Sequence, residues 1–452
     1  MKLTLPPFVL EIIERMEKAG HEIYIVGGAV RDLITTRESD DWDFTTNASP
    51  EEILEVFPDG FYDNKFGTVG VSHESSPNPY EITTYRTEHG YSDSRRPDKV
   101  EWGKSLKEDL QRRDFTINAI ALNPKKGDVE VIDPFDGQKD LEKKIVRAVG
   151  EADQRFREDA LRMMRAVRIA AELGFTIEEE TFEGIKKNVS LINKIAKERI
   201  KDELFKIMAS PNPYEGMLLF RNSGLMAEIL PEMEKTFGVE QKSPGRHHIH
   251  DVGTHSMLSL KEVAKRNTDP LVRFATMIHD IGKPQTYKML KNGTITFYNH
   301  EVVGASIAKN IAERLRFSRK ETGKLIKFVR WHQFTVTEEQ TDAAIRRFMR
   351  RVGKENVPDM LDLRVGDRLG GGARETSWRL EEFKERLIEV QKQPFTVHDL
   401  KIKGDDVMKE IGIKPGPKVG EILEKLFEEV VEKKLPNERE ALLKKLKEFN
   451  DE

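Results

Sequence analysis

The sequence predicts an α+β multidomain protein, with a small mixed sheet near the N-terminus and mostly α-helical domains after it. Up to about residue 145, strand-like segments alternate with helix-like segments. From about residue 150 onward, alternation of the β type nearly disappears and helical periodicity dominates. A chain of 452 residues is also long enough for two to four domains and a sizeable buried core.

The expected strands are N-terminal segments with strand-like composition. They are residues 22–26, 41–46, 68–73, 80–86 and 115–122. In the first of them, four apolar residues from Ile23 to Val26 run into Gly27 and Gly28, and a helix-prone segment follows. This order predicts a strand, a turn and a helix.

The first long helix is expected around the segment Arg155–Arg168. An apolar stripe extends from Leu161 to Leu173, and Gly174 is expected to end the helix. Arg155–Arg168 holds five arginines against two acids, and Ile345–Arg351 is similarly basic. Both are candidates for RNA contact, although a run of charges is more often only a solvated face.

Proline and glycine punctuate the helical part of the chain. Pro211–Pro213 and Gly224 interrupt the middle of it, and Lys392–Pro394 reads as a late linker. Lys414–Pro417 predicts a tight turn before a final pair of charged helices. There is no internal repeat and no low-complexity tail.

Composition limits the classes of function that the chain can serve. The net charge of −4 gives no global sign of a nucleic-acid partner, so RNA contacts must come from local basic faces. The absence of cysteine excludes disulfides and thiolate metal sites, which leaves Asp, Glu and His as metal ligands. No signal-peptide pattern and no apolar run of membrane-spanning length are present, so we expect a cytoplasmic protein without a membrane partner.

Two aspartates near the glycine turn indicate a metal site. Side chains alternate along a strand, so Asp41 and Asp43 share one face while Trp42 points away. Glycines let backbone N–H groups approach a phosphate, and a helix N-terminus favours anions. Two carboxylates beside such a phosphate cradle are what a pair of Mg²⁺ ions needs.

An Asp-x-Asp pair alone usually marks a solvated strand or a turn, and a lone Gly-Gly pair indicates even less. Their combination about a dozen residues apart, joined by Arg31 and Asp32, favours the metal site. Glu81 adds a third carboxylate, as an isolated acid on the strand-like segment 80–86. On an adjacent strand it would complete a carboxylate triad for phosphoryl or nucleotidyl transfer.

Five motifs in order give the N-terminal 210 residues a family resemblance. They are Gly27-Gly28 with Arg31-Asp32 and Asp41-x-Asp43; Arg112-Arg113-Asp114-Phe115-Thr116-Ile117-Asn118-Ala119; Asp133-Pro134-Phe135 with Gly137; Glu158-Asp159-x-x-Arg162; and Glu198-Arg199-Ile200-x-x-Glu203-Leu204. Each alone could arise by chance. Together the segment resembles the class II tRNA nucleotidyltransferase and poly(A) polymerase family, which comprises the CCA-adding enzymes and their relatives.

The resemblance implies roles for the residues that bind the nucleotide. Arg112 and Arg113 supply cations for the triphosphate, and Asp114 accepts a hydrogen bond from the ribose 2′-OH. The nucleotide site is completed by Gly27, Gly28, Arg31, Asn118, Asp159 and Arg162 of these motifs, and by Arg165, which follows the fourth motif.

In the family, the Glu-Asp-x-x-Arg motif acts as a protein template for the incoming base. Asp159 and Arg162 are three residues apart, which on a helix would place them on one face, although a helix salt bridge is the plainer alternative. The segment Tyr91–Pro97 resembles the flexible loop that CCA-adding enzymes need for switching from C to A. The loop argues against an enzyme that adds only CC.

Histidines cluster in the second half of the chain. Seven of the eleven fall between His247 and His332. The series His255, His279-Asp280, His300, His332 and Asp367 resembles the HD phosphohydrolase superfamily, in which an adjacent His-Asp pair anchors a metal on a helical bundle.

Such residues offer ligands for one or two divalent ions, and they suit Mn, Ni, Fe or Zn better than Mg. His247, His248 and His250 are expected at the surface or outside the ligand shell. The alternative is a helical domain retained mainly as an RNA-binding scaffold. The segment Gly404–Gly420 also resembles the tail of bacterial CCA-adding enzymes, which implies a role in holding the outer part of tRNA.

These observations lead to one prediction of function with open alternatives. The chain is predicted to add C, C and A to tRNA from CTP and ATP, with Mg²⁺ on Asp41 and Asp43 beside Glu81. The HD domain is a candidate for a second activity, a metal-dependent phosphohydrolase. The predicted domains are a catalytic head (1–147), a neck (148–215), a body with the HD domain (216–390) and a tRNA-binding tail (391–452). The alternatives are a bacterial poly(A) polymerase and an HD phosphohydrolase with a regulatory nucleotide-binding head. Whether one enzyme adds all three nucleotides, and its oligomeric state, are left open.

Overall fold

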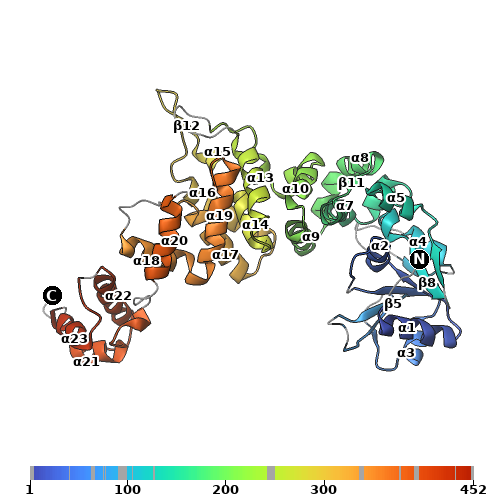
Figure 1. Cartoon of the computed structure of the whole chain (residues 1–452), viewed down its shortest axis with the longest axis horizontal. Coiled ribbons are helices and arrows are strands. Elements are labelled where there is room, and N and C mark those ends of the chain that lie inside the picture. The colour runs from blue at the N-terminus through green and yellow to red at the C-terminus, as the bar shows by residue number, and fades with distance from the viewer. Residues whose placement is uncertain are drawn as a thin grey trace. The chain divides into compact units, whose positions relative to one another are not determined.

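The computed structural model describes most of the 452 residues. The described residues are 5–39, 41–62, 67–74, 76, 78–89, 99–103, 105–125, 128–241, 250–334, 341–375, 378–390, 397–432 and 434–448. The chain forms two compact units, residues 1–235 with 311–317, and residues 236–310 with 318–452 (Figure 1). The predicted division into four domains is finer than these two units and stays a prediction.

The first unit begins with an α/β portion built around one sheet. Its helices are α1 (Pro7–Lys18), α2 (Gly28–Ile34), α3 (Pro50–Val56), α4 (Leu106–Gln111) and α5 (Gly137–Lys143). Its strands are β1 (Ile23–Val26), β2 (Asp43–Thr46), β3 (Phe61–Tyr62), β4 (Thr68–Val71), β5 (Tyr80–Thr84), β6 (Arg86–His89), β7 (Lys99–Trp102), β8 (Ala121–Lys125), β9 (Asp128–Ile132) and β10 (Ile145–Val146).

The main sheet of this portion is mixed, as the sequence predicts. Seven strands follow the order β3-β4-β5-β2-β1-β8-β9, and β2 and β5 form the parallel pair among antiparallel neighbours. The helices α1 and α3 pack beside the sheet (Figure 1). Strand β1 is buried along Ile23, Ile25 and Val26, so the residues that follow it and the start of β2 are carried on a rigid core.

One predicted strand is wrong in part. The segment 115–122 was expected to be continuous β-structure, but Thr116–Asn118 forms a 3-10 helix and β8 begins only at Ala121. Asn118 and Phe115 both hydrogen-bond to the side chain of Asp114. These local bonds satisfy a backbone N–H outside any sheet, so β-propensity alone predicted the wrong local structure.

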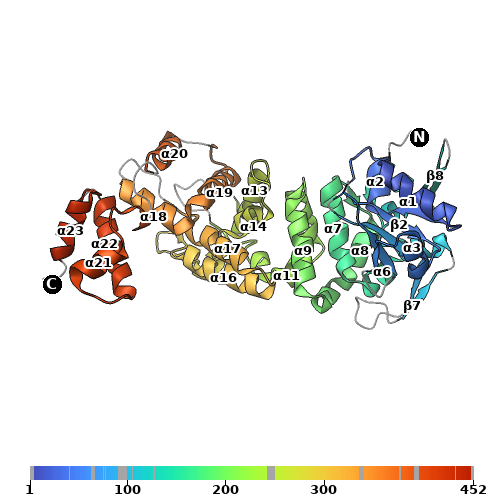
Figure 2. The same ribbon diagram turned by 90° about the horizontal axis from the view of Figure 1, so that it is seen from below.

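Helices dominate the rest of the first unit. They are α6 (Ala152–Glu158), α7 (Leu161–Leu173), α8 (Glu179–Asn188), α9 (Lys197–Ala209), α10 (Pro213–Asn222), α11 (Leu225–Ile229) and α12 (Pro231–Glu234), with a short strand β11 (Thr176–Ile177) and a 3-10 turn at Val189–Lys194. Figure 2 shows α6, α7 and α8 together, and each of α7 and α8 contacts α6. Gly174 ends α7 in the left-handed conformation, at φ +69°, as predicted.

The basic segment Arg155–Arg168 is two helices instead of one. Asp159 lies between them with extended backbone angles (φ −137°, ψ 106°), and α7 begins at Leu161. The Asp159 carboxylate accepts the backbone N–H of Leu161 at 3.0 Å. A short polar side chain that accepts a backbone N–H two residues ahead competes with a continuous helix. The apolar periodicity of the sequence does not reveal such a bond, so the break was not predicted.

The second unit is mostly helical. Its elements are α13 (Val252–Val263), α14 (Pro270–Ile278), α15 (Lys283–Thr286), β12 (Lys288–Met289), β13 (Ile295–Thr296), α16 (His300–Arg314, whose last turn groups with the first unit), α17 (Arg319–Trp331), α18 (Asp342–Val352), α19 (Val357–Gly370), α20 (Trp378–Val390), α21 (Gly404–Ile411), α22 (Pro417–Val431) and α23 (Arg439–Glu448), with 3-10 turns at Lys354–Asn356 and Val397–Asp399.

Close packing holds the central helices of this unit. A Cβ on Gly370 of α19 would lie 2.6 Å from the backbone nitrogen of Ser259 on α13, so these two helices approach at backbone distance. The final helices α21, α22 and α23 share an apolar core around Leu426 and Leu442. The predicted turn Lys414–Pro417 joins α21 to α22, whereas the linker Lys392–Pro394 lies outside the described residues. Among the described residues, no helix has the length and apolar character needed to cross a membrane.

Candidate active site and a histidine–aspartate cluster

The carboxylates of the predicted metal site meet at one edge of the main sheet. Asp43 opens β2 and faces Glu81 of β5 directly in the parallel register, and Asp41 precedes Asp43 by two residues. Trp42 is buried at 5% exposure, so it points into the core while Asp41 and Glu81 are exposed. Glu81 therefore lies on the strand adjacent to that of Asp43, as a carboxylate triad would need.

The electrostatics of Asp43 show how close these groups are. Burial, and next the charge of Asp41, raise the pKa of the Asp43 carboxyl to about 6, and Glu81 adds to the rise. Arg113 and Arg165 oppose it. Like charges held together on a rigid sheet are costly without a counter-ion, so this edge attracts cations.

The glycine turn lies against these carboxylates. Gly27 follows β1 with φ +77°, a left-handed conformation that favours glycine. A Cβ on Gly27 would lie 3.1 Å from Asp43 Oδ2 and 3.5 Å from Arg113 Nη1. Gly28 begins α2, where a Cβ would meet Arg31 Nη2 at 3.6 Å. The strand, turn and helix predicted here are confirmed.

The predicted triphosphate-binding arginines are anchored by a residue that the sequence analysis missed. Asp109 on α4 is fully buried and accepts hydrogen bonds from Arg112 Nη2 at 2.6 Å and from Arg113 Nη2 at 3.3 Å. The spacing of three and four residues at the end of a helix indicates such ion pairs, but it does not show that Asp109 is buried. Arg113 Nε is buried and has no hydrogen-bond partner among the described residues.

Asp114 anchors a polar network that joins three predicted nucleotide-binding residues. Its carboxylate accepts from Asn118 Nδ2 at 3.2 Å and from Arg165 Nε at 2.7 Å. Asn118 in turn accepts a hydrogen bond from Arg31 Nη1 at 3.1 Å. Burial alone would raise the pKa of Asp114, but the charges of Arg165 and Arg162 outweigh it and lower the pKa to about 2.

The two predicted base-reading residues lie on different elements. Asp159, between α6 and α7, is held by Arg199 Nη2 at 3.0 Å. Arg162, in the first turn of α7, is held by Glu158 at 2.7 Å and donates to the backbone oxygen of Arg112 at 3.0 Å. The expectation that both share one helical face is therefore wrong. Asp159 lies just before α7, and Arg162 lies in its first turn. Helix α7 therefore contacts the Arg112–Ala119 motif through the Arg112 carbonyl.

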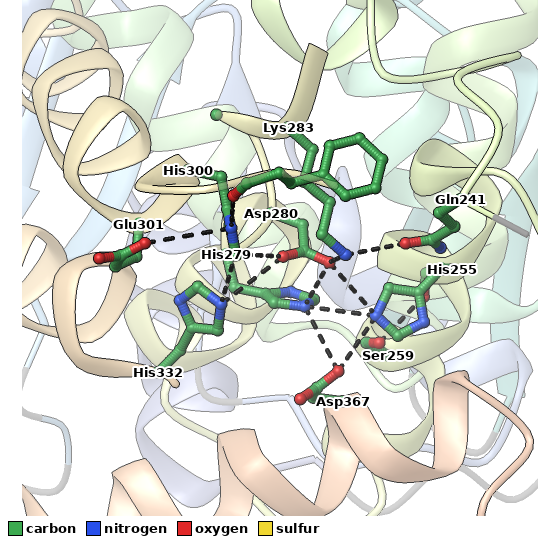
Figure 3. A network of polar contacts seen from close by, with 12 residues as sticks. Gln241, His255, Ser259, His279, Asp280, Lys283, His300, Glu301, His332 and Asp367 are labelled. Atoms are coloured by element: carbon green, nitrogen blue, oxygen red, sulfur yellow. Dashed lines mark hydrogen bonds and ion pairs between the residues drawn. The ribbon is translucent and has the colours of Figure 1, made fainter. Parts of the chain in front are cut away.

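A separate cluster in the second unit unites all six residues of the histidine series (Figure 3). Asp280 lies at its centre. One carboxylate oxygen, Oδ2, is 3.2 Å from His279 Nε2, and the other, Oδ1, is 3.3 Å from His300 Nε2 and 3.5 Å from His332 Nε2. Asp367 Oδ1 completes the cluster at 3.1 Å from His255 Nε2.

The imidazoles are oriented by backbone carbonyls. The Nδ1 atoms of His279, His300 and His332 lie 2.6, 2.8 and 2.8 Å from the carbonyl oxygens three residues earlier, Thr276, Phe297 and Val329. When Nδ1 donates in this way, Nε2 presents a lone pair to the centre of the cluster, which is the arrangement found at metal-binding histidines.

Two groups of side chains in the cluster have the spacing of metal ligands. They are His255, His279 and Asp367, and His279, Asp280 and His332. Burial alone would lower the pKa of His279, but the charges of Asp280 and Asp367 outweigh it and raise the pKa to about 10. The cluster therefore favours positive charge, either a proton on His279 or a metal ion that displaces it, and its histidine side chains are buried.

A cavity of about 640 Å³ opens onto this cluster. Basic side chains line it beside the ligands, including Lys283, Arg364 and Arg368. Lys283 Nζ lies 2.6 Å from Asp280 Oδ2 and donates to Gln241 at 2.8 Å. Arg364 Nη1 lies 2.8 Å from Asp367 Oδ2. The cavity can therefore take an anion next to a metal.

Some predicted features are not part of either site or cannot be placed. His250 lies outside the two ligand groups, as expected. His247, His248 and the predicted switching loop Tyr91–Pro97 lie outside the described residues.

Comparison with known families and proteins identifies the chain. Residues 23–147 match the family described as "Poly A polymerase head domain", residues 174–237 match "Probable RNA and SrmB- binding site of polymerase A", and residues 302–446 match a second-domain family of tRNA nucleotidyltransferases. The CCA-adding enzyme of Limosilactobacillus reuteri is 33% identical over 469 residues and covers 100% of both chains. The CCA-adding enzyme of Geobacillus kaustophilus is 47% identical over 50% of this chain and 55% of its own length.

Solved structures agree with the sequence relatives. The Bacillus stearothermophilus CCA-adding enzyme in complex with CTP matches with a TM-score of 0.71 and 28% identity, over 99% of this chain and 98% of that one. The Thermotoga maritima CCA-adding enzyme complexed with tRNA shares the fold, with a TM-score of 0.58 and 21% identity over 98% of this chain and 95% of that one. The protein is thus a nucleotidyltransferase that belongs to the family of CCA-adding enzymes.

Proposed function

We propose that this enzyme adds C, C and A to the 3′ end of tRNA, using CTP and ATP and no nucleic-acid template. The observation that carries the proposal is the pairing of Asp43 with Glu81 across two parallel strands, next to Asp41 and against the Gly27 turn. Membership of the CCA-adding enzyme family supports it. Because tRNA and nucleoside triphosphates are the substrates, we also propose that it works in the cytoplasm.

The carboxylate edge fits the divalent metal that the family implies. The donor atoms are hard oxygens, which suit Mg²⁺, and a bound cation would offset both the burial and the charges of Asp41 and Glu81 that raise the pKa of Asp43. We assign Asp41 and Asp43 as the ligands and Glu81 as the third catalytic carboxylate. Bound there, Mg²⁺ supplies stabilisation of the charge that develops on the reacting phosphate.

The other predicted residues hold the nucleotide. Arg113, with Nη1 near Gly27 and a buried Nε, is directed at the place where a triphosphate would meet the carboxylates. Asp114, kept ionised by Arg165, can accept a hydrogen bond from a ribose hydroxyl, and Gly28, Arg31, Arg112 and Asn118 complete this assignment. The tRNA 3′-oxygen forms a bond to the α-phosphorus while the bond to pyrophosphate breaks, so pyrophosphate leaves and no covalent enzyme intermediate forms.

Base selection is assigned to Asp159 and Arg162 at the start of α7. Both side chains are held in place, by Arg199 and by Glu158, before any nucleotide binds. A fixed acceptor and a fixed fork of donors can match the edge of cytosine or adenine. We assign residues 1–147 to the catalytic head, 148–215 to the neck, 216–390 to the body and 391–452 to a tRNA-binding tail.

The test is incubation with tRNAs that lack CCA, CA or A, each with CTP alone, ATP alone or both. Completion of all three by the single protein supports the proposal. Repeated addition of A to every tRNA would instead mean a poly(A) polymerase. Absence of any nucleotide addition would refute the assignment of the head.

A second activity is favoured by the histidine–aspartate cluster. We propose that its six residues bind one or two transition-metal ions and hydrolyse a small phosphoester or a 2′,3′-cyclic phosphate, as an HD phosphohydrolase would. Imidazole and carboxylate ligands suit Mn²⁺, Ni²⁺, Fe²⁺ or Zn²⁺. The cations Lys283, Arg364 and Arg368 on the cavity wall can hold the phosphate beside the ligands.

Metal analysis of the purified protein and hydrolysis assays with each of these ions test the second activity. Bound metal that is lost in Asp280→Ala, together with hydrolysis that depends on the metal, supports it. If no metal binds and no phosphoester is cleaved with any ion, the unit is a scaffold.

A further inference from the structure

A fully buried carboxylate near the triphosphate site has no part in the roles assigned above. Asp109 lies on α4 with 0% of its surface exposed. Its Oδ1 accepts hydrogen bonds from Arg112 Nε at 2.9 Å and from Arg112 Nη2 at 2.6 Å. Its Oδ2 accepts from Arg113 Nη2 at 3.3 Å and from the Thr45 hydroxyl at 3.2 Å. All of these partners are protein groups, and none of the Asp109 surface is exposed to the solvent from which a nucleotide would bind.

The partners of Asp109 connect the catalytic strand to the phosphate-binding arginines. Thr45 lies on β2 two residues after Asp43, and side chains two apart point to the same face of a strand. The other terminal nitrogen of Arg113, Nη1, lies at the Gly27 turn, 3.5 Å from where a Cβ on Gly27 would stand. Asp109 therefore joins the strand of the metal ligands and the guanidinium groups in one rigid unit.

Asp109 is also charged under the conditions of the reaction. Burial alone would raise the pKa of its carboxyl, but Arg112 and then Arg113 outweigh burial and lower the pKa. The carboxylate screens the repulsion between two guanidinium groups that stand side by side with 16% and 18% of their side chains exposed.

We propose that Asp109 is a positioning residue for nucleoside triphosphate binding, which orients Arg112 and Arg113 before the nucleotide arrives. This inference rests on the proposed function of the head, because it concerns the same triphosphate site. Preorganised cations gain affinity because their ordering is complete before binding. The same geometry serves CTP and ATP alike, since Asp109 acts on the phosphates and not on the base.

Asp109→Asn tests the proposal, because the amide keeps the volume and one acceptor oxygen but loses the charge. Steady-state kinetics with tRNA lacking A should show KM for ATP raised about tenfold or more, with kcat changed far less. Inhibition by inorganic pyrophosphate, which binds the same cations without any base, should weaken by a similar factor. An unchanged KM, or a loss confined to kcat, overturns the proposal.

Asp140→Asn is the matched control. Asp140 is also buried, at 4% exposure, and accepts the Thr116 hydroxyl at 2.7 Å and Arg147 Nε at 3.1 Å. Its arginine pairs onward with Glu178, and its partner Thr116, although part of the Arg112–Ala119 motif, is not among the residues assigned to the nucleotide. Thermal unfolding should report a similar loss of stability in both variants, whereas KM for ATP should rise only in Asp109→Asn. A rise in KM of the same size in both variants would mean that Asp109 is merely structural.

A double-mutant cycle with Arg113→Ala shows whether Asp109 acts through its partner. If it orients Arg113, the two variants together should raise KM by clearly less than the product of their separate effects. If KM in the double variant rises by the full product of the two separate increases, Asp109 does not act through Arg113 and the proposal is overturned. Wild-type protein without nucleotide addition would instead refute the proposed function, so the two failures are distinguishable.

Discussion

Asp43 and Glu81 face each other in register across the parallel strands β2 and β5, although 38 positions separate 43 from 81 in the sequence. This pairing joins the Asp-x-Asp motif to a third carboxylate. The neighbouring Asp41 is exposed, while burial and the charge of Asp41 raise the pKa of Asp43 to about 6.

Asp41→Asn, Asp43→Asn and Glu81→Gln should each lower the rate of nucleotide addition by at least about a hundredfold, because each removes a charge that stabilises the transition state. Binding of tRNA, measured by gel shift, should change little. Asp59→Asn, an exposed residue of the same portion, is the control and should keep full activity. Near-normal turnover in Asp43→Asn would refute the metal site.

The stability of the head should depend on the charge of Asp43. Between about pH 4 and pH 6 the folded state binds more protons at Asp43 than the unfolded state does, so the free energy of unfolding falls as pH rises through this range. At pH 8 without Mg²⁺, Asp43→Asn should therefore be more stable than wild type by about 1–2 kcal/mol. Mg²⁺ should stabilise wild type and not the variant. Thermal melts at pH 4 and 8, with and without Mg²⁺, measure both effects, and equal melts at pH 8 would contradict the prediction.

Gly27→Ala should abolish most activity through crowding of Asp43. Its φ of +77° makes any side chain unfavourable by about 1 kcal/mol, and its Cβ would stand 3.1 Å from Asp43 Oδ2. Gly20→Ala is the control, because Gly20 has φ +89° but open space around a Cβ. Both variants should lose similar stability in thermal melts, and only Gly27→Ala should lose nucleotide addition. Equal activities would show that the turn serves the fold alone.

Asp159→Ala and Arg162→Ala should relax the preference for CTP and ATP over GTP and UTP more than they weaken triphosphate binding. These side chains are assigned to the base edge, whereas Arg113 is assigned to phosphate. Misincorporation assays with each nucleotide measure the ratio of kcat/KM values. Arg157→Ala, an exposed residue of α6 that pairs with Asp153, should leave the ratio unchanged. An equal loss for all four nucleotides would indicate a structural ion pair.

Asp280→Ala should abolish binding of a transition metal in the second unit while nucleotide addition persists. Asp280 lies within 3.6 Å of all four histidines of the cluster, so its loss removes one ligand of the second group and the carboxylate at the centre of the cluster. Metal content by elemental analysis and CCA addition by the same preparation are the two measurements. His250→Ala, outside the ligand groups, should keep both. Retention of full metal content in Asp280→Ala would place the metal elsewhere.

The sequence by itself determined the parts of the site that lie on short motifs. The turn at Gly27, the aspartates at 41 and 43, and the helix end at Gly174 all follow from local rules of backbone conformation and side-chain alternation. The mixed fold class also followed from the change in periodicity near residue 150. Ordered motifs implied the family, which the comparisons confirmed.

Only the tertiary structure decided which distant residues meet. No local rule sets the register of β2 on β5, because sheet pairing depends on the burial of whole strands. The break at Asp159 was missed because its side chain accepts the backbone N–H of Leu161. Such a bond competes with a continuous helix but leaves the apolar periodicity of the sequence unchanged. Asp109 was missed because its role depends on burial against β2, and a carboxylate beside arginines on a helix reads from sequence as a surface ion pair. Local sequence fixes which groups are available, whereas packing fixes their neighbours, and the chemistry of both sites depends on those neighbours.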